Sequence, residues 1–355
     1  MADRAAAVAT ASWSDPGPEE VGDGVFRIPL PLPGDGLKAV NAYLVHDDAG
    51  TILVDAGWDD PASWAELTRS LAHLGRTVGD VRRMFVTHLH PDHFGQAPRI
   101  RHQAGAVLTL GAGERESMER WMEAPTPEAT SAEWLTRLEA HGAEPLAEAV
   151  RVARAAGDHP PAMTHVVAER PDVYLTEGAH LPVGDRLLEV LATPGHTRGH
   201  LCLLDRDRGL LFAGDHILPH ITPSIGLEPP GPTRPLGDFL ASLAAVRDLP
   251  VSEVLPAHGP VFTDLAGRVD ALLAHHADRL ALMREVVGAG PASAFAVAQR
   301  VPWTRRQRRF GDLDLFNQTL AVSETIAHLE LLVGRGQLTR TPGTTVRYQA
   351  TAPGS

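Results

Sequence analysis

Short apolar runs alternate with segments of helical periodicity along the first two-thirds of the chain. Runs rich in β-branched and aromatic residues, bounded by Gly, Pro or Asp, predict β-strands at 25–30, 40–45, 51–55, 81–86, 106–110, 187–191, 201–204 and 210–213. Apolar side chains on one face predict helices at 61–74, 96–103 and 238–246. Because strands and helices alternate in two similar halves, the pattern predicts an α/β protein, a four-layer α/β/β/α sandwich.

Residues 114–168 interrupt this alternation. They are rich in Ala, Glu and Arg with helical spacing, and prolines divide them into short helices. We interpret the segment as a helical insertion between the two halves. Its large apolar residues, Trp121, Met122, Trp134 and Leu135, must pack against something. One hypothesis is a wall or lid over a substrate pocket; the alternatives are a solvated helical decoration or a contact between the subunits of a homodimer.

The two ends of the chain differ from its middle. Residues 1–20 combine an early acidic residue with little hydrophobicity, which predicts a disordered tail rather than a signal peptide. The sandwich is expected to span residues 21–263. Beyond it, helical periods at 265–287 and 316–333, a short helix from Pro291 and a hairpin at 338–348 predict a separate C-terminal domain over 264–355.

The composition restricts the range of partners and compartments. The 355 residues carry a net charge of −12 and a pI near 5.8, which argues against general binding to nucleic acid or to anionic membranes. Cys202 is the only cysteine, so a disulfide framework is excluded and a reducing, cytoplasmic location is expected. No segment has the apolar length that a membrane span needs. The expected partner is therefore a small molecule.

The densest group of metal-binding side chains is the stretch THLHPDHFG at 87–95. It places four potential ligands in one turn-sized segment: His88, His90, Asp92 and His93. The strand expected at 81–86 ends just before them, so they fall in a loop where their side chains can converge. Imidazole nitrogens with one carboxylate suit zinc and its first-row neighbours better than calcium or magnesium.

This stretch resembles the HxHxDH signature of the metallo-β-lactamase superfamily of metal hydrolases. The superfamily also needs a third histidine, a bridging aspartate and a last histidine, in that order. The chain has them in TPGHTRGH, LLFAGDH and VLPAHG, as His196, Asp215 and His258. Each follows a short apolar run, as the first group does. The resemblance covers roughly residues 20–262.

The resemblance implies a centre of two divalent metal ions. One would be held by three histidines and the other by an aspartate and two histidines: His88, His90 and His196, and Asp92, His93 and His258. Asp215 would bridge them. The two ions, by default Zn2+ although Fe or Mn fits the same donors, would share a hydroxide that attacks a substrate carbonyl. Asp92 and Asp215 would then be the catalytic side chains, Asp92 by orienting the nucleophile or moving its proton.

Four further residues are expected around this centre. Asp55 stands in a turn that resembles the family's DAG-like turn, whose aspartate supports the ligand loop without binding metal. His200 resembles the second histidine of the family's PGHTxGH motif, which also has a supporting role. His216 and His220 lie next to Asp215 in sequence and are candidates for lining the substrate pocket.

The resemblance implies hydrolysis of a thioester, ester or lactone, as in the glyoxalase-II-like hydrolases. Glutathione thioesters are less expected, because the glutathione-binding part of glyoxalase II carries lysines near its C-terminus and the only lysine here is Lys38. A β-lactamase would use the same attack on a carbonyl. The alternative from another class is a metal-dependent endoribonuclease or phosphodiesterase of the lactamase-B2-like type.

The predicted C-terminal domain resembles the winged helix that is appended to the lactamase-B2-like branch. Such a module can bind nucleic acid. The helix expected at 316–333, however, contains Glu324 and Glu330 and no Lys or Arg, whereas a helix that reads a groove exposes basic or amide side chains. The basic run RRQRR at 305–309 lies in the preceding loop. We therefore expect a module that packs against the sandwich, and nucleic acid as an unlikely partner.

Overall fold

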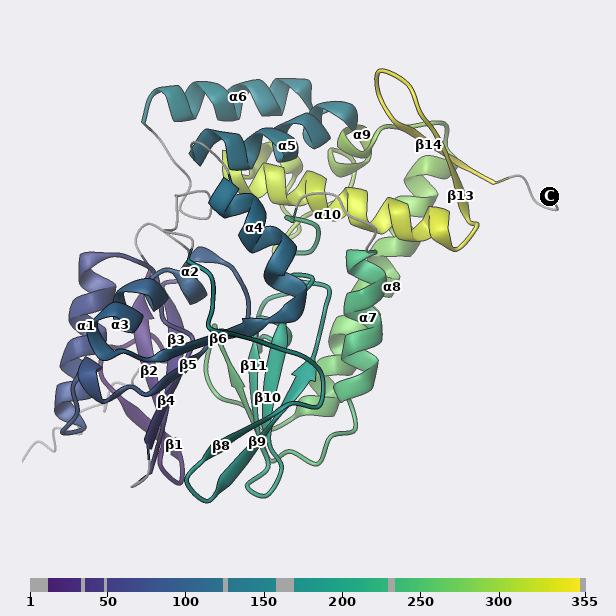
Figure 1. Cartoon of the computed structure of the whole chain (residues 1–355). Helices are drawn as coiled ribbons and strands as arrows, with labels where there is room; N and C mark the ends of the chain where they lie inside the picture. Colours follow the sequence, from purple (N-terminus) through teal and green to yellow (C-terminus); the bar gives the residue numbers. More distant parts are fainter. Residues whose placement is uncertain are drawn as a thin grey trace, which may run out of the picture.

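The computed structural model describes residues 12–32, 36–47, 50–123, 127–157, 169–228 and 234–351. Within them, two β-sheets of seven and five strands face each other, and helices cover both outer faces (Figure 1). The protein is therefore the four-layer α/β/β/α sandwich that the alternating pattern predicts.

The first sheet has the strand order β1-β2-β3-β4-β5-β6-β7. Its first four strands pair antiparallel, and β4 to β7 pair parallel. The strands are β1 (Glu19–Gly22), β2 (Val25–Pro31), β3 (Ala39–Asp47), β4 (Gly50–Val54), β5 (Arg83–Phe85), β6 (Val107–Gly111) and β7 (Val173–Leu175).

The second sheet has the order β12-β11-β10-β9-β8, antiparallel except for the parallel pair β11 and β12. Its strands are β8 (His180–Val183), β9 (Arg186–Ala192), β10 (Leu201–Asp205), β11 (Leu210–Gly214) and β12 (Glu253–Pro256). The sequence pattern did not indicate β7 and β8. β7 is too short to show a period, and β8 is an outer strand whose exposed Pro182 reads as a turn.

Apolar side chains fill the layer between the sheets, among them Val45, Phe85, Leu203 and Phe212. The Tyr43 ring meets the Phe212 ring edge to face at 5.6 Å. The Tyr43 hydroxyl donates to the Pro256 carbonyl at 2.7 Å. Since Tyr43 belongs to β3 and the other two to the second sheet, this buried tyrosine fixes how the two sheets register on each other.

Helices α1 (Pro61–His73) and α3 (Ala97–Ala104) cover the outer face of the first sheet. α1 begins where the Asp60 carboxylate accepts from Ala62 N at 2.8 Å, with Pro61 at the first helical position. Leu67 and Leu71, one turn apart, are both fully buried against the sheet. Burial of each contributes roughly 1.5–3 kcal/mol, so Leu67→Ala or Leu71→Ala should loosen this layer.

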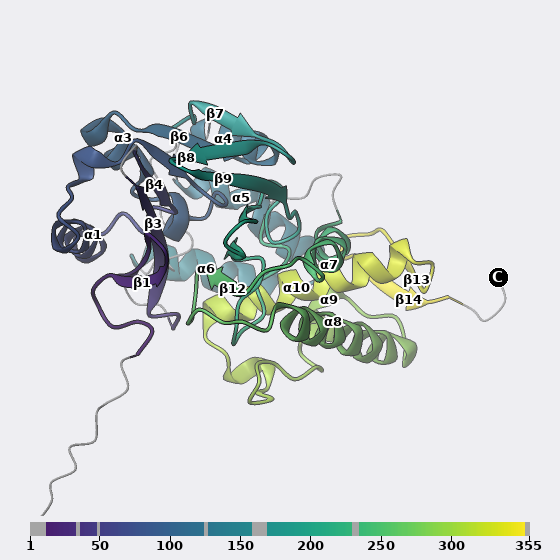
Figure 2. The ribbon, with the colours of Figure 1, turned by 90° about the horizontal axis from the view of Figure 1, so that it is seen from below.

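The outer face of the second sheet is covered by α7 (Pro235–Val246), α8 (Leu265–Gly288) and α10 (Leu315–Gly334). Cys202 on the sheet, Phe239 on α7, Leu272 on α8 and Ile326 on α10 share one apolar cluster. The view from below shows α8 and α10 side by side, next to α7 (Figure 2). Through α7 and the shared apolar cluster, the C-terminal helices are continuous with the fourth layer.

The helical insertion consists of α4 (Arg115–Glu123), α5 (Pro127–Ala140) and α6 (Glu144–Ala155), after the short 3-10 turn Ala112–Glu114. The sequence pattern places this insertion between the two halves of the sandwich. In the structure it instead connects the neighbouring parallel strands β6 and β7 of the first sheet. Residues 158–168 of the predicted segment lie outside the described residues. α5 and α6 lie above α10 in Figure 1, and Leu135 packs into the same apolar cluster as α10.

The C-terminal region has the expected order of three helices and a hairpin: α8, α9 (Ala294–Ala298), α10, and β13 (Leu338–Thr341) paired with β14 (Arg347–Ala350). α10 is buried on several faces, including its polar Thr325 and His328. A helix so enclosed has no face left for a nucleic-acid groove. The assignment of this region as a winged helix stays a prediction.

The predicted disordered tail is wrong for its described part. β1 begins at Glu19, Gly17 N donates to a Glu66 carboxylate oxygen at 2.9 Å, and the Trp13 carbonyl accepts from Arg27. These contacts bind residues 12–20 to the first sheet and α1. Residues 1–11 lie outside the described residues. None of the described helices has the length and hydropathy that crossing a bilayer demands.

Candidate metal centre

The loops that follow β5, β9, β11 and β12 meet at one edge of the sandwich. His88 and His90 lie just after β5, and α2 (Pro91–Phe94) then carries the next candidate ligands. His196 follows β9 and Asp215 directly follows β11. β9 and β11 run in the same direction because both pair antiparallel with β10, and β12 pairs parallel with β11, so the C-terminal ends of all three lie at one edge.

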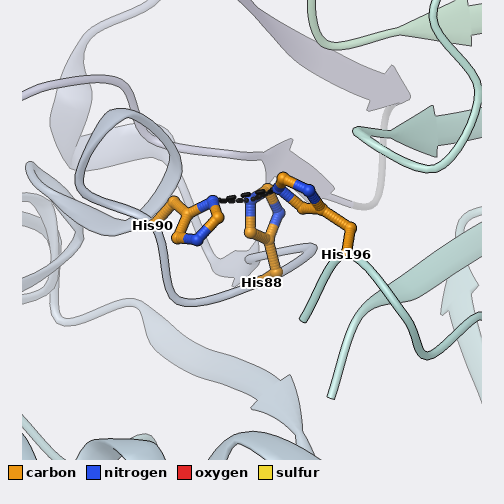
Figure 3. Close-up of side chains that lie close together, drawn as sticks. All are labelled: His88, His90 and His196. Carbon is orange, nitrogen blue, oxygen red and sulfur yellow. Dashed lines mark hydrogen bonds between the residues drawn. The ribbon is translucent and has the colours of Figure 1, made fainter. Parts of the chain in front are cut away.

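The first ligand group consists of three imidazole nitrogens that point at one another (Figure 3). His88 Nε2 lies 2.9 Å from His90 Nδ1, and His196 Nε2 lies 3.2 Å from the former and 3.0 Å from the latter. Nitrogens bound tetrahedrally to zinc at about 2.0–2.1 Å are about 3.3 Å apart. The spacing is therefore close to that of three ligands of one ion.

Hydrogen bonds to the ring nitrogens that face away from the centre determine which nitrogen of His196 and His88 is unprotonated. His196 Nδ1 lies 2.7 Å from the Ser224 carbonyl, which can only accept, so its Nε2 is the unprotonated nitrogen of the neutral ring. Thr87 Oγ1 donates to Asp55 Oδ2 at 3.0 Å and is left to accept from His88 Nδ1, also at 3.0 Å. Both Nε2 lone pairs therefore face the centre, as metal binding requires.

The second group combines Asp92, His93 and His258. His258 Nε2 lies 3.2 Å, and His93 Nε2 3.5 Å, from Asp92 Oδ2. The opposite nitrogens donate outward, His258 Nδ1 to the Ala39 carbonyl at 2.9 Å and His93 Nδ1 to Asp55 Oδ2 at 2.8 Å. Both Nε2 atoms are buried without a hydrogen-bond partner among the described residues. Two orphaned nitrogens beside a carboxylate are what a cation site would satisfy.

Asp215 lies between the two groups. Its Oδ2 is 3.5 Å from His196 Nε2, on the side of the first group. Its Oδ1 is 3.6 Å from His93 Nε2 and 3.5 Å from His258 Nε2, on the side of the second. One carboxylate therefore directs one oxygen toward each group of ligands.

The electrostatics of the centre differ between the two groups. Burial, followed by the charge of His196, lowers the pKa of His90 to about 3. Burial also lowers the pKa of His196 to about 4. Burial opposes the charged form of His93 as well, but the carboxylates of Asp92, Asp55 and Asp215 together raise its pKa. The first group thus favours neutral imidazoles, whereas the second gathers negative charge that attracts a cation.

Two residues expected to support the ligands contact them in the structure. Asp55 accepts from Thr87 N at 2.8 Å and holds Thr87 Oγ1 and His93 as described, from a left-handed backbone with φ of 59°. His200 Nε2 accepts from Asp215 N at 3.1 Å, and its Nδ1 donates to Thr193 Oγ1 at 2.7 Å. Neither belongs to a group of convergent ligand atoms among the described residues.

The two histidines expected to line the pocket lie in different environments. His220 is exposed and lines the cavity above the centre. The expectation for His216 is wrong: it is fully buried, with its ring 5.3 Å from that of Phe239. His216 N donates to the Ala213 carbonyl at 2.9 Å in the turn after β11, and this turn directs the ring into the apolar layer beneath α7.

A cavity of about 1040 Å³ opens over the centre. Its metal end is lined by candidate ligands, and its other walls come from the insertion and from α8, α10 and the loop between them. Trp121 and Trp134 of the insertion line it, and Trp134 Nε1 donates to Ser323 Oγ at 3.3 Å. Met122 is 39% exposed, so the expectation that it must be buried is wrong.

Glu114 is a buried residue of this cavity that the sequence pattern did not identify. It is fully buried and accepts from Thr197 Oγ1, next to His196. Burial, then the nearby Glu228 carboxylate, raises the pKa of Glu114 to about 8. No local sequence pattern identifies Glu114 as a cavity residue, because its contact with Thr197 joins positions 83 residues apart.

Fold and centre together define a metal-binding enzyme. The family model described as "Metallo-beta-lactamase superfamily" matches residues 35–258, and the chain belongs to that superfamily as a metal-dependent hydrolase. A second family model, "Metallo-beta-lactamase-like, C-terminal domain", matches residues 280–351.

Similar proteins carry names of the same kind. A "probable metallo-hydrolase" of Bacillus subtilis is 26% identical and covers 88% of this chain and 93% of its own length. The human "acyl-coenzyme A thioesterase MBLAC2" (Homo sapiens) is 25% identical, over 81% of this chain and 96% of its own. A "beta-lactamase-like protein 2 homolog" of Caenorhabditis elegans is 25% identical, over 76% and 72%.

Two solved structures resemble nearly the whole chain. A metallo-beta-lactamase family protein from Thermus thermophilus has a TM-score of 0.73 at 29% identity and covers 92% of this chain and 99% of its own. A beta-lactamase domain protein from Burkholderia ambifaria has a TM-score of 0.77 at 27% identity, over 97% of each chain. The C-terminal layer is therefore shared with these proteins.

Proposed function

We propose that the protein is a dinuclear metal hydrolase that attacks the carbonyl of a thioester, ester or lactone. The position of Asp215 carries this proposal, because its two carboxylate oxygens face two separate ligand groups. A single-metal centre would leave one of these groups, and its orphaned nitrogens, without a purpose.

The residues that would hold the metals divide as the distances suggest. Three histidines would bind one ion and an aspartate with two histidines the other: His88, His90 and His196, and Asp92, His93 and His258. Nitrogen-rich donors at this spacing favour zinc, and iron or manganese fits the same set. When bound, the two ions would polarise the substrate carbonyl and lower the pKa of a water between them.

The protein's own side chains then arrange the reaction. Asp92 turns Oδ2 toward the histidines, and its other oxygen, Oδ1, is left to orient the attacking water and accept its proton. Asp55 and His200 keep His93 and Asp215 in place through the bonds described above. The apolar walls from Trp121 and Trp134 hold the acyl or leaving group and exclude water around the carbonyl.

Thioesters are the preferred substrate class within this proposal. The relative named as an acyl-coenzyme A thioesterase matches most of the chain, although at 25% identity. Nuclease activity is the weaker candidate, because the enclosed α10 cannot enter a groove. A glutathione thioester is also disfavoured, since the only lysine is Lys38.

Three further expectations belong to this proposal. Residues 21–263 would form the catalytic domain and 264–355 a winged-helix-like domain that packs against it. A cytoplasmic location suits the single cysteine, Cys202, whose thiol is fully buried. Sedimentation equilibrium distinguishes a homodimer from a monomer.

Metal content and turnover test the proposal together. The purified protein should hold close to two metal ions per chain and hydrolyse one or more of a panel of acyl-CoA and glutathione thioesters, lactones, bis-p-nitrophenyl phosphate and single-stranded RNA. Asp215→Ala should lower occupancy and reduce turnover by roughly a factor of 1000 or more, while the fold survives. His180→Ala, at an exposed histidine of β8, is the matched control and should change neither.

Unchanged turnover in Asp215→Ala would refute the mechanism. Strong, salt-sensitive RNA cleavage by the wild type, without thioester hydrolysis, would instead reverse the order of the two candidate functions.

A further inference from the structure

Three arginines line the cavity wall that is formed by α8 and by the loop before α10: Arg268, Arg279 and Arg305. Among the described residues, none of the three has a carboxylate oxygen within ion-pair distance. Arg268 and Arg279 donate to neutral backbone carbonyls instead, and the carboxylate of Glu324 acts on Arg279 only from beyond ion-pair distance. Some arginines elsewhere pair with a carboxylate, such as Arg247 with Asp270 at 2.7 Å, and others do not. What distinguishes these three is that they line one cavity, where a bound anion can reach them.

The groups on this wall influence one another. Burial, followed by the charge of Arg305, lowers the pKa of Arg268. Burial, followed by Arg279, also lowers the pKa of His275, which lines the same wall. Two acids, Asp278 and Glu324, share the wall. Asp278 is exposed to solvent, and burial raises the pKa of Glu324, which weakens its capacity to neutralise the arginines.

The loop that carries Arg305 has an unusual backbone. Trp303 and Arg308 exchange backbone hydrogen bonds of 2.8 and 2.7 Å, and between them Thr304 and Gln307 have φ of 63° and 53°. A β-branched threonine in the left-handed region is strained. Such strain persists where surrounding contacts impose it, and often at functional sites.

Contacts from α8 and α9 hold this loop against the cavity. The Arg279 guanidinium lies over the Trp303 ring at 4.2 Å, and Trp303 Nε1 donates to the Ala298 carbonyl at 2.8 Å. Among the described residues, the other two non-glycine positions with left-handed φ are Lys38 and Asp55. Asp55 supports the ligand loop, so one of the remaining strained positions already belongs to the metal centre.

We propose that Arg268, Arg279 and Arg305 form a subsite for an anionic group of the substrate, a phosphate or a carboxylate, while the metal centre takes the carbonyl. This rests on the proposed hydrolase function and narrows its substrate class. Guanidinium groups bind both anions through paired, charge-assisted hydrogen bonds. Trp121 and Trp134, which line the same cavity, would contact the apolar part of the same molecule.

The anion could come from either half of a thioester. A phosphate would belong to the thiol half, as in coenzyme A, and a carboxylate to the acyl half, as in a dicarboxylic monothioester. Three substrates separate these sources: butyryl-coenzyme A, glutaryl-N-acetylcysteamine and the neutral butyryl-N-acetylcysteamine.

Arg305→Ala is the test variant, because the side chain is exposed at the cavity rim and its loss should not impair folding. Arg306→Ala is the matched control, being exposed in the same loop without lining the cavity. We expect Arg305→Ala to reduce kcat/KM about 10- to 100-fold for one anionic substrate, chiefly through KM, and to leave the neutral substrate unchanged. Arg306→Ala should leave all three substrates unchanged.

A binding measurement does not depend on turnover. Coenzyme A should quench the tryptophan fluorescence of the wild type, since Trp121 and Trp303 line the cavity, and glutarate should do so if the carboxylate is the anion recognised. Arg305→Ala and added salt should weaken that quenching, with or without metal.

Equal losses in Arg305→Ala and Arg306→Ala, or equal losses on charged and neutral substrates, would overturn the subsite. Binding of single-stranded RNA that falls equally in both variants would overturn it as well, in favour of a nucleic-acid surface. If no ester is hydrolysed but anion binding still depends on Arg305, the subsite stands and the proposed function fails.

Discussion

Asp55→Asn is the substitution that most sharply tests how the protein prepares its second ligand group. The Asp55 carboxylate accepts three hydrogen bonds on two oxygens, from Thr87 N at 2.8 Å, Thr87 Oγ1 at 3.0 Å and His93 Nδ1 at 2.8 Å. An asparagine amide has only one oxygen, so it cannot accept from donors on both sides. Asn also tolerates the left-handed φ of 59°, so the backbone should be retained.

Asp55→Asn should weaken metal binding by changing the tautomer of His93. If the amide oxygen stays with Thr87 N, the amide nitrogen faces His93 Nδ1 as a donor. The ring must then accept at Nδ1 and carry its proton on Nε2, the nitrogen that points toward Asp92 and Asp215. Losing such a supporting contact typically weakens metal binding 10- to 100-fold, which is about 1.4–2.7 kcal/mol.

Metal titration should therefore show one ion bound as in the wild type and the other bound about 10- to 100-fold more weakly. Equilibrium dialysis at several free zinc concentrations, read by elemental analysis, measures both affinities. Asp59→Asn changes an exposed carboxylate in the same turn and should bind as the wild type does. If Asp55→Asn kept both affinities, the tautomer reasoning for His93 would be refuted.

Two further predictions concern the cavity and the C-terminal layer. Trp121→Ala should raise KM for a decanoyl thioester about tenfold more than for an acetyl thioester, because it removes apolar contact area, whereas exposed Met122→Ala should not discriminate by chain length. Burial lowers the pKa of His276 to about 2 and of His328 to about 3, so both stay neutral when folded but bind protons near pH 6.5 when unfolded. Their contribution to stability is therefore lost as the pH falls below 6.5, at about 1.4 kcal/mol per histidine at pH 5.5. The free energy of unfolding in urea is expected to fall for the wild type between pH 7.5 and pH 5.5. In the double variant His276→Phe/His328→Leu this fall should be smaller by about 3 kcal/mol, and an unchanged fall would contradict this account.

Much of the fold follows from local pattern. The strand runs and helix periods predict most elements to within a few residues, for example α8, which runs Leu265–Gly288. The failures have one cause. The burial of a short strand such as β8 depends on the first sheet, because its Leu181 and Val183 pack with Val45 and Val54. The course of residues 12–20 depends likewise on Arg27 and Glu66.

By itself, the sequence determined which side chains can bind metal and in what order they occur, because a dense histidine motif and its later partners are local patterns. Those seven residues lie together in the structure. Their mutual distances, and the side on which each ring is protonated, depend on contacts such as that of His258 with Ala39, which are 219 positions apart.

Only the tertiary structure decided what surrounds the centre. Glu114, Arg279 and Trp303 come from three separate segments and meet in one cavity because α8, α10 and the insertion share an apolar layer with the second sheet. His216, beside a candidate ligand in sequence, is directed away from the cavity by a single turn. Local sequence specifies which groups a chain carries; their placement around a substrate follows from burying apolar faces that lie far apart along it.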